Sequence, residues 1–267
     1  MSKGNYVSMR VTIHDLQKMK RDGQRIPVLT CYDYTSAKIL DSAGLPVLLV
    51  GDSLGMVVLG LDSTLPVTLE MMIHHCRAVA RGAEHAMIVL DLPFATYTPS
   101  DIPFSLANAA RAMAEGGAHA VKIEGGARMA PVVAALVSAG IPVMGHVGLT
   151  PQSVHQFGGY KMQGREDAAK KRLLADALEL ESAGAFAIVL ELVASDLAGT
   201  ISKRLKIPTI GIGAGKNCDG QVQVFHDVFG LYEDFVPKHA RRYLNMAADM
   251  RAAAKAYIGD VAAGKFP

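Results

Sequence analysis

Residues 47–55 read VLLVGDSLG, and this stretch decides the fold. Four apolar residues follow one another without a polar interruption, and Gly51, Asp52 and Ser53 come directly after them. An uninterrupted Val/Leu run is typical of a parallel strand that is buried on both faces. In a closed barrel of such strands the active site lies where the strands end. The stretch therefore predicts both a kind of sheet and the edge that carries the chemistry.

The same pattern recurs along the chain, where short apolar runs alternate with helical segments. Strands are predicted over residues 27–33, 46–53, 86–93, 120–126, 142–149, 185–193, 208–215 and 221–228. Helices are predicted between them over 36–44, 67–82, 105–117, 129–140, 166–184 and 195–206. Several of these helices end in SAG or EGG, and glycine takes the left-handed conformation that ends a helix.

This order predicts an α/β fold, a (β/α)8 TIM barrel, as a single domain over residues 1–267. A short N-terminal helix over 14–23, capped by Thr12, precedes the barrel, and a helical segment over 238–263 follows it. An open doubly wound sheet is the alternative. The phrase GIGAG at 211–215 comes late and lacks the third glycine of a dinucleotide-binding fingerprint.

Composition excludes several classes of protein. The chain has 267 residues, of which 50% are hydrophobic, and this suits one large domain with a substantial core. Its net charge is +2, its basic residues are scattered and it has no Trp, so we expect no nucleic-acid partner. Mean hydropathy is +0.23, yet no run reaches the roughly 18 apolar residues of a membrane span. Either a large core or burial between subunits would account for the excess apolar content.

Cysteine usage and the first residues bear on the compartment. Cys31, Cys76 and Cys218 are far apart, odd in number and without a C-x-x-C pair. Zinc and disulfide frameworks are both weak interpretations of such spacing. The opening MSKGNYVSMRVTIHDL has no apolar export segment, so the expectation is a cytoplasmic protein.

Three carboxylates follow neighbouring predicted strands. Asp52, Asp91 and Glu124 stand at or near the ends of the second, third and fourth strands. One such Asp alone would ordinarily cap the following loop. Three together repel one another and raise each other's pKa unless a cation is present. Oxygen ligands without Cys or clustered His favour Mg²⁺ over zinc.

Other polar residues near strand ends have two interpretations each. Lys122 precedes Glu124 by two residues, so both side chains share a face of the strand. Lys122 would either balance charge or bind a substrate carboxylate or carbonyl oxygen. Ser53 would either cap its loop or donate a hydrogen bond to a substrate carboxylate.

Glu191 and His146 end two later strands. Glu191 follows a buried apolar run, where an unpaired carboxylate is costly. It is therefore paired, solvated at the strand end, or tuned as a base. His146 is assigned a supporting polar role, because a lone histidine is more often structural.

Long phrases of this sequence resemble the ketopantoate hydroxymethyltransferase family. They include VGDSLGMVVLGLDSTLPVT, DLPFATY, VKIEGG, GHVGLTPQSV, FGGYKMQGR, VLELV, IPTIGIGAG and DGQVQVFHDVFGL. The phrases stand in family order and extend over most of the chain, from residue 10 to residue 257.

The resemblance implies a barrel related to phosphoenolpyruvate mutase and isocitrate lyase. It implies transfer of a hydroxymethyl group from 5,10-methylenetetrahydrofolate to 3-methyl-2-oxobutanoate, giving 2-dehydropantoate in pantothenate and coenzyme A synthesis. It also implies a homo-oligomer, typically a decamer.

For site residues, the resemblance implies Mg²⁺ held by Asp52, Asp91 and Glu124. The keto acid would be bound by Asp52, Ser53, Asp91 and Lys122, and Glu191 would be the proton acceptor. Removal of the C3 proton gives an enolate, which positive charge from Mg²⁺ and Lys122 stabilises. The phrase FGGYKMQGR at 157–165 is either a lid over this site or an ordinary surface loop.

Competing functions remain at this point. A Mg²⁺-dependent lyase or aldolase on 2-oxo acids would use the same chemistry without folate. A Schiff-base aldolase through Lys122 is disfavoured, because a lysine beside three carboxylates stays protonated. A barrel kept for binding alone is disfavoured because the set of acids, base and lysine is complete.

Overall fold

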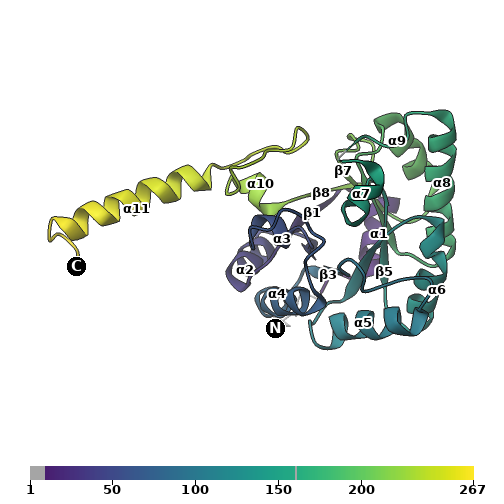
Figure 1. The fold of residues 1–267 in the computed structure, drawn as a ribbon, viewed down its shortest axis with the longest axis horizontal. Coiled ribbons are helices and arrows are strands. Elements are labelled where there is room, and N and C mark those ends of the chain that lie inside the picture. The colour runs from purple at the N-terminus through teal and green to yellow at the C-terminus, as the bar shows by residue number, and fades with distance from the viewer. Residues whose placement is uncertain (1–9, 160) are drawn as a thin grey trace, which may run out of the picture. The chain divides into compact units, whose positions relative to one another are not determined.

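Eight parallel strands close into a barrel in chain order, from β1 to β8 (Figure 1). The computed structural model describes residues 10–159 and 161–267. The strands are Ile26–Thr30 (β1), Val47–Val50 (β2), Met87–Asp91 (β3), Ala120–Glu124 (β4), Val143–Gly148 (β5), Ala187–Glu191 (β6), Thr209–Ile212 (β7) and Gly220–Gln223 (β8). The barrel predicted from the uninterrupted apolar runs is confirmed, and the open doubly wound sheet is wrong.

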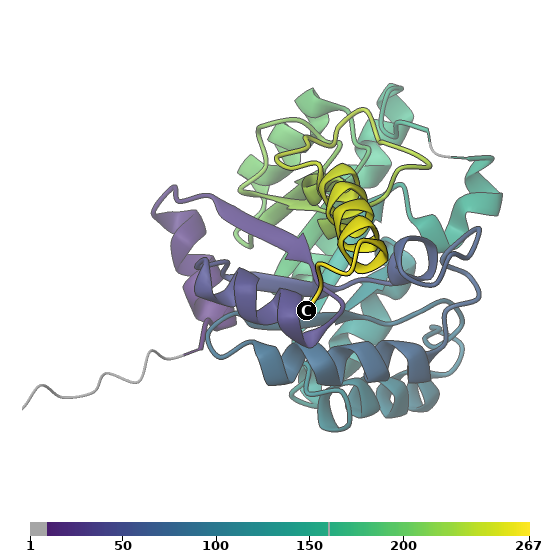
Figure 2. The ribbon, with the colours of Figure 1, turned by 90° about the vertical axis from the view of Figure 1, so that its left-hand side faces the viewer.

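Helices lie outside the strands, as the views in Figures 1 and 2 show. Thr68 begins one of them by accepting a hydrogen bond from the Met71 N–H at 3.2 Å, and Asp101 begins another by accepting from the Phe104 N–H at 2.9 Å. Such side-chain caps satisfy backbone donors that the first turn leaves unpaired. The helices around the barrel, capped or not, are Tyr34–Ser42 (α2), Leu54–Val57 (α3), Leu69–Gly82 (α4), Ile102–Ala114 (α5), Ala130–Ser138 (α6), Val154–Phe157 (α7), Asp167–Ser182 (α8) and Ser195–Arg204 (α9).

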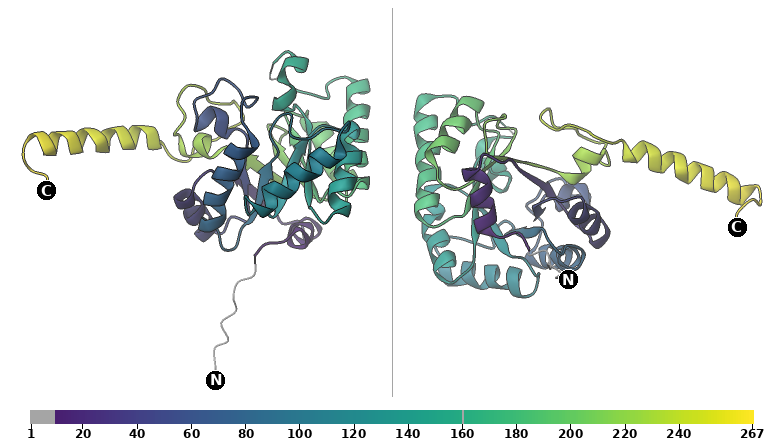
Figure 3. Two further views of the ribbon diagram at one scale, coloured as in Figure 1. Left: turned by 60° about the horizontal axis from the view of Figure 1, so that its bottom comes forward. Right: turned by 180° about the vertical axis from the view of Figure 1, so that it is seen from behind.

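Helix α1 (Ile13–Arg21) covers the amino-terminal end of the barrel (Figure 3). Thr12 and Asp15 form a reciprocal capping box, so the predicted cap is confirmed. Leu16 is fully buried and belongs to the same apolar cluster as Ile26, Val47 and Met87, which stand at or near strand starts. The apolar end of the barrel is therefore closed, and polar side chains are left to the opposite end.

Alternation along each strand determines which residues reach the barrel interior. The interior cluster takes every second residue, including Met87 and Val89 of β3 and Ala187 and Val189 of β6. Because successive side chains point to opposite faces, the next inward residues along β3, β4, β5 and β6 are polar, whereas in β7 the next inward residue is Ile212. These inward polar residues are Asp91, Lys122, Glu124, His146 and Glu191.

The chain divides into two compact units, one ending at Val222 and the other running from Gln223 to Pro267. The second unit holds α10 (Phe225–Phe229) and α11 (Met246–Ala262). No helix in the described ranges is long and apolar enough to cross a membrane.

Several predicted bounds are wrong. Strand β1 stops at Thr30 rather than at residue 33, because Asp33 instead caps α2 by accepting the Ser36 N–H at 2.9 Å. The eighth strand stops at Gln223, and the next residues form α10, which ends at Gly230 in the left-handed region.

The predicted C-terminal helix over 238–263 begins only at Met246. Ahead of it, the Tyr243 N–H donates to the Val228 carbonyl at 2.8 Å, which places that backbone outside a helical ladder. Helix α3 was not predicted. The segment 151–157, where no helix was predicted, contains a short 3₁₀ turn (η2, Pro151–Ser153) and α7. Within the predicted lid, residue 160 lies outside the described residues.

Candidate active site

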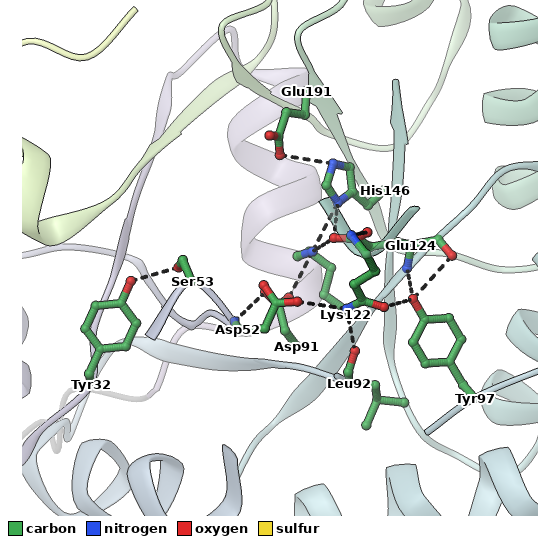
Figure 4. A network of polar contacts seen from close by, with 11 residues as sticks. Tyr32, Asp52, Ser53, Asp91, Leu92, Tyr97, Lys122, Glu124, His146 and Glu191 are labelled. Carbon is green, nitrogen blue, oxygen red and sulfur yellow. Dashed lines mark hydrogen bonds and ion pairs between the residues drawn. The ribbon is translucent and has the colours of Figure 1, made fainter. Parts of the chain in front are cut away.

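Acidic and basic side chains from five consecutive strands and their following loops gather at the carboxyl end of the barrel (Figure 4). Sheet register places them side by side: Asp91 is opposite Lys122, and Glu124 is opposite His146. The cluster consists of Asp52, Asp91, Lys122, Glu124 and His146, each at most 5% exposed, with Glu191 beside them. The structure therefore brings the six charged or titratable residues singled out from the sequence into one site.

Lys122 stands between two of the acids. Its Nζ lies 3.0 Å from Asp91 Oδ1 and 3.8 Å from Glu124 Oε1, which confirms that Lys122 and Glu124 share a strand face. Burial lowers the pKa of Lys122, but Asp91, Glu124 and Asp52 outweigh burial and raise it above its ordinary value. A protonated amine cannot attack a carbonyl carbon, so this arrangement disfavours a Schiff base at Lys122.

Asp52 and Asp91 are held close together and away from water. Asp91 Oδ2 accepts the backbone N–H of Asp52 at 3.2 Å, so Asp91 also secures the loop after β2. Burial, with repulsion from Asp91 and Glu124, raises the pKa of Asp52 to about 8. Burial also raises the pKa of Asp91, although Lys122 opposes the shift. Additional positive charge at this place would return both acids to their ionised forms.

The chemistry of these residues suits a hard divalent cation. Asp91 Oδ1 is buried and makes no hydrogen bond within the described ranges, its contact with Lys122 being an ion pair. The side chains of Asp52, Asp91 and Glu124 offer only oxygen donors, which Mg²⁺ prefers. No three His, Cys, Asp or Glu side chains in the described part of the chain already stand at metal-ligand spacing. The carboxylate oxygens are thus the type of ligand that Mg²⁺ prefers. Their spacing in the structure reflects pairing with Lys122 and with the loop backbone.

His146 bridges the buried acids and Glu191. Its Nδ1 lies 3.3 Å from Glu124 Oε1 and 3.1 Å from Lys122 Nζ, and its Nε2 lies 3.3 Å from Glu191 Oε2. Burial and Lys122 lower the pKa of His146, but Glu124 and Glu191 outweigh them and raise it to about 9. His146 and Lys122 in turn outweigh burial at Glu124 and lower its pKa. The imidazole therefore connects Glu191 electrostatically to the rest of the cluster.

Glu191 ends β6 beside a strained residue. Its side chain is 17% exposed, so it lies at the border between the cluster and solvent. Leu192, the next residue, has φ of 46°, a left-handed conformation that is costly for leucine. Hydrogen bonds on both sides hold it there: its N–H donates to the Ile212 carbonyl at 2.9 Å, and its carbonyl accepts from the Gln163 N–H at 2.7 Å. The chain therefore changes direction immediately after Glu191, the candidate base.

Ser53 does not serve as the loop cap that was considered for it. It occupies the N-cap position of α3, but its side chain makes no capping hydrogen bond. Its Oγ instead lies 2.9 Å from the Tyr32 hydroxyl, and burial raises the pKa of Tyr32 above its ordinary value. A neutral tyrosine thus orients the Ser53 hydroxyl at the edge of the cluster.

Sequence reasoning missed Gln152 and Tyr97. The Gln152 Nε2 donates to Asp52 Oδ2 at 2.9 Å and to the Leu92 carbonyl at 3.0 Å, while its backbone N–H donates to Glu124 Oε2 at 3.0 Å. Tyr97 donates its hydroxyl to Gln152 Oε1 at 2.7 Å and accepts the Glu124 N–H at 2.9 Å. The phrases DLPFATY and GHVGLTPQSV contain both residues, but nothing in either phrase indicates a contact between them.

Comparisons with known proteins agree on one family. The family model described as ketopantoate hydroxymethyltransferase matches residues 10–267. Proteins named 3-methyl-2-oxobutanoate hydroxymethyltransferase from Chloroflexus aurantiacus and Syntrophus aciditrophicus are 58% and 54% identical to this chain. Each alignment covers 97% of this chain, with 91% of the first relative and 94% of the second.

Solved structures of more distant proteins share the fold. A phosphoenolpyruvate phosphomutase from Streptomyces platensis subsp. rosaceus aligns with a TM-score of 0.62 at 13% identity, over 95% of this chain and 88% of that one. A 2,3-dimethylmalate lyase, described as a PEP mutase/isocitrate lyase superfamily member, aligns with a TM-score of 0.59 at 16% identity, over 93% and 86%. These likenesses agree with the expected (β/α)8 barrel fold.

Proposed function

The chain belongs to the ketopantoate hydroxymethyltransferase family, and from that premise we propose that it transfers a hydroxymethyl group to 3-methyl-2-oxobutanoate. The donor is 5,10-methylenetetrahydrofolate, and the product is 2-dehydropantoate, an intermediate of pantothenate biosynthesis. This reaction class is supported by the names of the chain's relatives, which are 3-methyl-2-oxobutanoate hydroxymethyltransferases. We also propose that the protein is cytoplasmic, as expected from the sequence. The three buried, unpaired cysteines would stay reduced in that compartment.

The keto acid would be held by positive charge and hydroxyl groups at the carboxyl end of the barrel. Asp52, Asp91 and Glu124 would hold Mg²⁺, and Mg²⁺ would supply positive charge where the 2-oxo oxygen becomes negative. Lys122 adds a second positive charge that burial keeps strong. Ser53, oriented by Tyr32, donates a hydrogen bond to the substrate carboxylate.

Glu191 would remove the C3 proton of the keto acid. It ends a barrel strand and is the one acid of the cluster that remains partly exposed, so a bound substrate can reach it. His146 Nε2, 3.3 Å from Glu191 Oε2, positions the carboxylate and accommodates its change of charge. The resulting enolate carbon takes the one-carbon unit of the donor, water supplies the hydroxyl oxygen, and tetrahydrofolate leaves.

A single observation carries this proposal: one continuous set of contacts runs from the partly exposed Glu191 through His146 and Glu124 to the buried, positively charged Lys122. A lyase acting on a 2-oxo acid would need the same contacts. The two functions differ in the need for a folate donor, which a product assay with and without the donor decides.

Proton exchange tests the base. With keto acid and Mg²⁺ alone, the enzyme in D₂O should exchange the C3 proton, followed as loss of its NMR signal. Glu191→Gln keeps the size but cannot accept the proton, so exchange and product formation should both fall by about a hundred- to ten-thousandfold. Glu84→Gln, on an exposed loop, is the matched control and should exchange normally. Exchange at the wild-type rate in Glu191→Gln would show that another group is the base.

A further inference from the structure

A cavity of about 210 Å³ adjoins the candidate active site. It lies between the carboxyl ends of β4 and β5 and the face of α8, and Gly125, Gly148, Arg128, Arg172 and Asp176 are among its lining residues. Gly125 directly follows Glu124, and Gly148 is the register partner of Glu191. The cavity therefore shares a backbone wall with the cluster while holding none of its side chains.

Two guanidinium groups reach this cavity without a protein partner. Across the described ranges, the side chains of Arg128 and Arg172 make no hydrogen bond and no ion pair, although seven other Lys and Arg side chains form salt bridges with carboxylates. An alanine-like Cβ at Gly125 would lie 3.4 Å from Arg128 Nε and 3.5 Å from its Nη2, so this guanidinium lies directly over the Gly125 backbone. Both arginines are exposed enough to be charged and hydrated.

Asp176, the acid that lines the cavity, pairs with the backbone and not with either arginine. Asp176 Oδ1 accepts the Ala127 N–H at 2.9 Å. A Cβ at Gly126 would lie 2.2 Å from the Asp176 carboxyl carbon, so the carboxylate is packed against this backbone. Asp176 is one helical turn from Arg172 on α8, yet the two form no ion pair. With one carboxylate and two guanidiniums, the lining keeps a surplus positive charge.

We propose that this cavity binds the glutamyl end of the reduced-folate donor through Arg128 and Arg172; the inference rests on the proposed function. The donor ends in p-aminobenzoylglutamate, which carries carboxylates, and arginine pairs with carboxylates through two parallel hydrogen bonds. The cavity is smaller than the roughly 300–1,000 Å³ that encloses a whole drug-sized ligand, so it suits one end of the donor. Its shared wall with the Glu191 strand leaves the reactive end of the donor beside the keto acid.

Two donors and three enzymes test the assignment. Methylenetetrahydrofolate carries the glutamate, whereas the corresponding tetrahydropteroate derivative lacks it. For the glutamyl donor, Arg172→Gln should raise KM about tenfold, the low end expected for losing a hydrogen bond from a charged donor, with the loss falling on KM rather than on kcat. For the pteroate donor, Arg172→Gln and wild type should have equal KM values. Lys171→Gln removes the same charge from an exposed neighbour that does not line the cavity, and should match wild type with both donors.

A binding measurement without turnover separates this inference from the proposed function. Isothermal titration with p-aminobenzoylglutamate should give binding to wild type and to Lys171→Gln, about tenfold weaker binding to Arg172→Gln, and an intermediate value for Arg128→Lys, which keeps the charge but not the planar fork. Equal binding by all four proteins overturns the inference, as does equally effective competition by sulfate, which would indicate an unselective anion site. If wild type binds the fragment through the arginines but makes no product with either donor, the proposed function fails and the cavity assignment stands.

Discussion

Replacing Gln152 by Met tests whether the amide organises the buried acids. Met has a similar length but no donor or acceptor for the three groups that the Gln152 amide satisfies. These groups are Asp52 Oδ2 at 2.9 Å, the Leu92 carbonyl at 3.0 Å and the Tyr97 hydroxyl at 2.7 Å. The backbone N–H of residue 152 still reaches Glu124, so only the side-chain contacts are lost.

The expected loss follows from burial. Gln152 is 7% exposed, so water does not readily replace its hydrogen bonds. Each buried polar group left without a partner costs about 1–3 kcal/mol, and three groups together give about 3–6 kcal/mol of unfolding free energy. The Tyr97 hydroxyl keeps its hydrogen bond from the Glu124 N–H, which places the total below the sum of the upper values.

Urea unfolding at a fixed protomer concentration, followed by circular dichroism, measures this loss. Gln156→Met makes the same chemical change four residues later at an exposed position, and should change the unfolding free energy by less than about 0.5 kcal/mol. If Gln152→Met costs less than about 1 kcal/mol, the amide does not hold the acids in place and the reasoning from its contacts is wrong.

Three further outcomes are expected. Burial, with a contribution from Arg10, lowers the pKa of His119 to about 4 from 6.5, while its Nδ1 accepts the Ile88 N–H at 2.9 Å. Because the unfolded chain takes up this proton first, the free energy of unfolding should fall as the pH drops from 6.5 to 4. Solvent screens this partly exposed imidazole, so we expect a fall of about 1–2 kcal/mol, and His119→Gln should lose less over that range in urea titrations; equal losses would contradict this. Asp91→Asn should weaken Mg²⁺ affinity at least about tenfold by calorimetry and shift the Mg²⁺ dependence of activity upward, whereas wild-type turnover that survives thorough chelation would contradict a metal role. Light scattering at micromolar concentration should give a mass near ten times 28.3 kDa, and a monomer would refute the expected decamer.

The sequence alone determined the strand type and the end of each strand where the polar residues stand. Runs such as MIVLD and AIVLE are buried along their length, so they require a sheet that is covered on both sides. Side-chain alternation along a strand is a local property of the backbone. It placed Lys122 and Glu124 on one face of their strand before any contact was known, while Asp91 and Glu191 were placed only at strand ends. Carboxyl ends of parallel strands share one edge, which is why the predicted residues meet.

The ends of elements were less predictable, because caps and distant hydrogen bonds compete with local preference. Asp33 was predicted to end the first strand, but it lies outside β1 and its side chain caps α2. The residues from 238 to 245 suit a helix by composition, yet the Tyr243 backbone pairs with α10 instead.

Only the tertiary structure decided the partners within the site. Gln152 and Asp52 are 100 residues apart, and they meet only because strand order brings the loops after β2 and β5 to the same end of the barrel. The contact of Ser53 with Tyr32 and the place of His146 between Glu124 and Glu191 have the same origin. Alternation along one strand is set by local backbone geometry, whereas contacts between strands depend on how the whole barrel closes, and no single stretch of sequence contains that information.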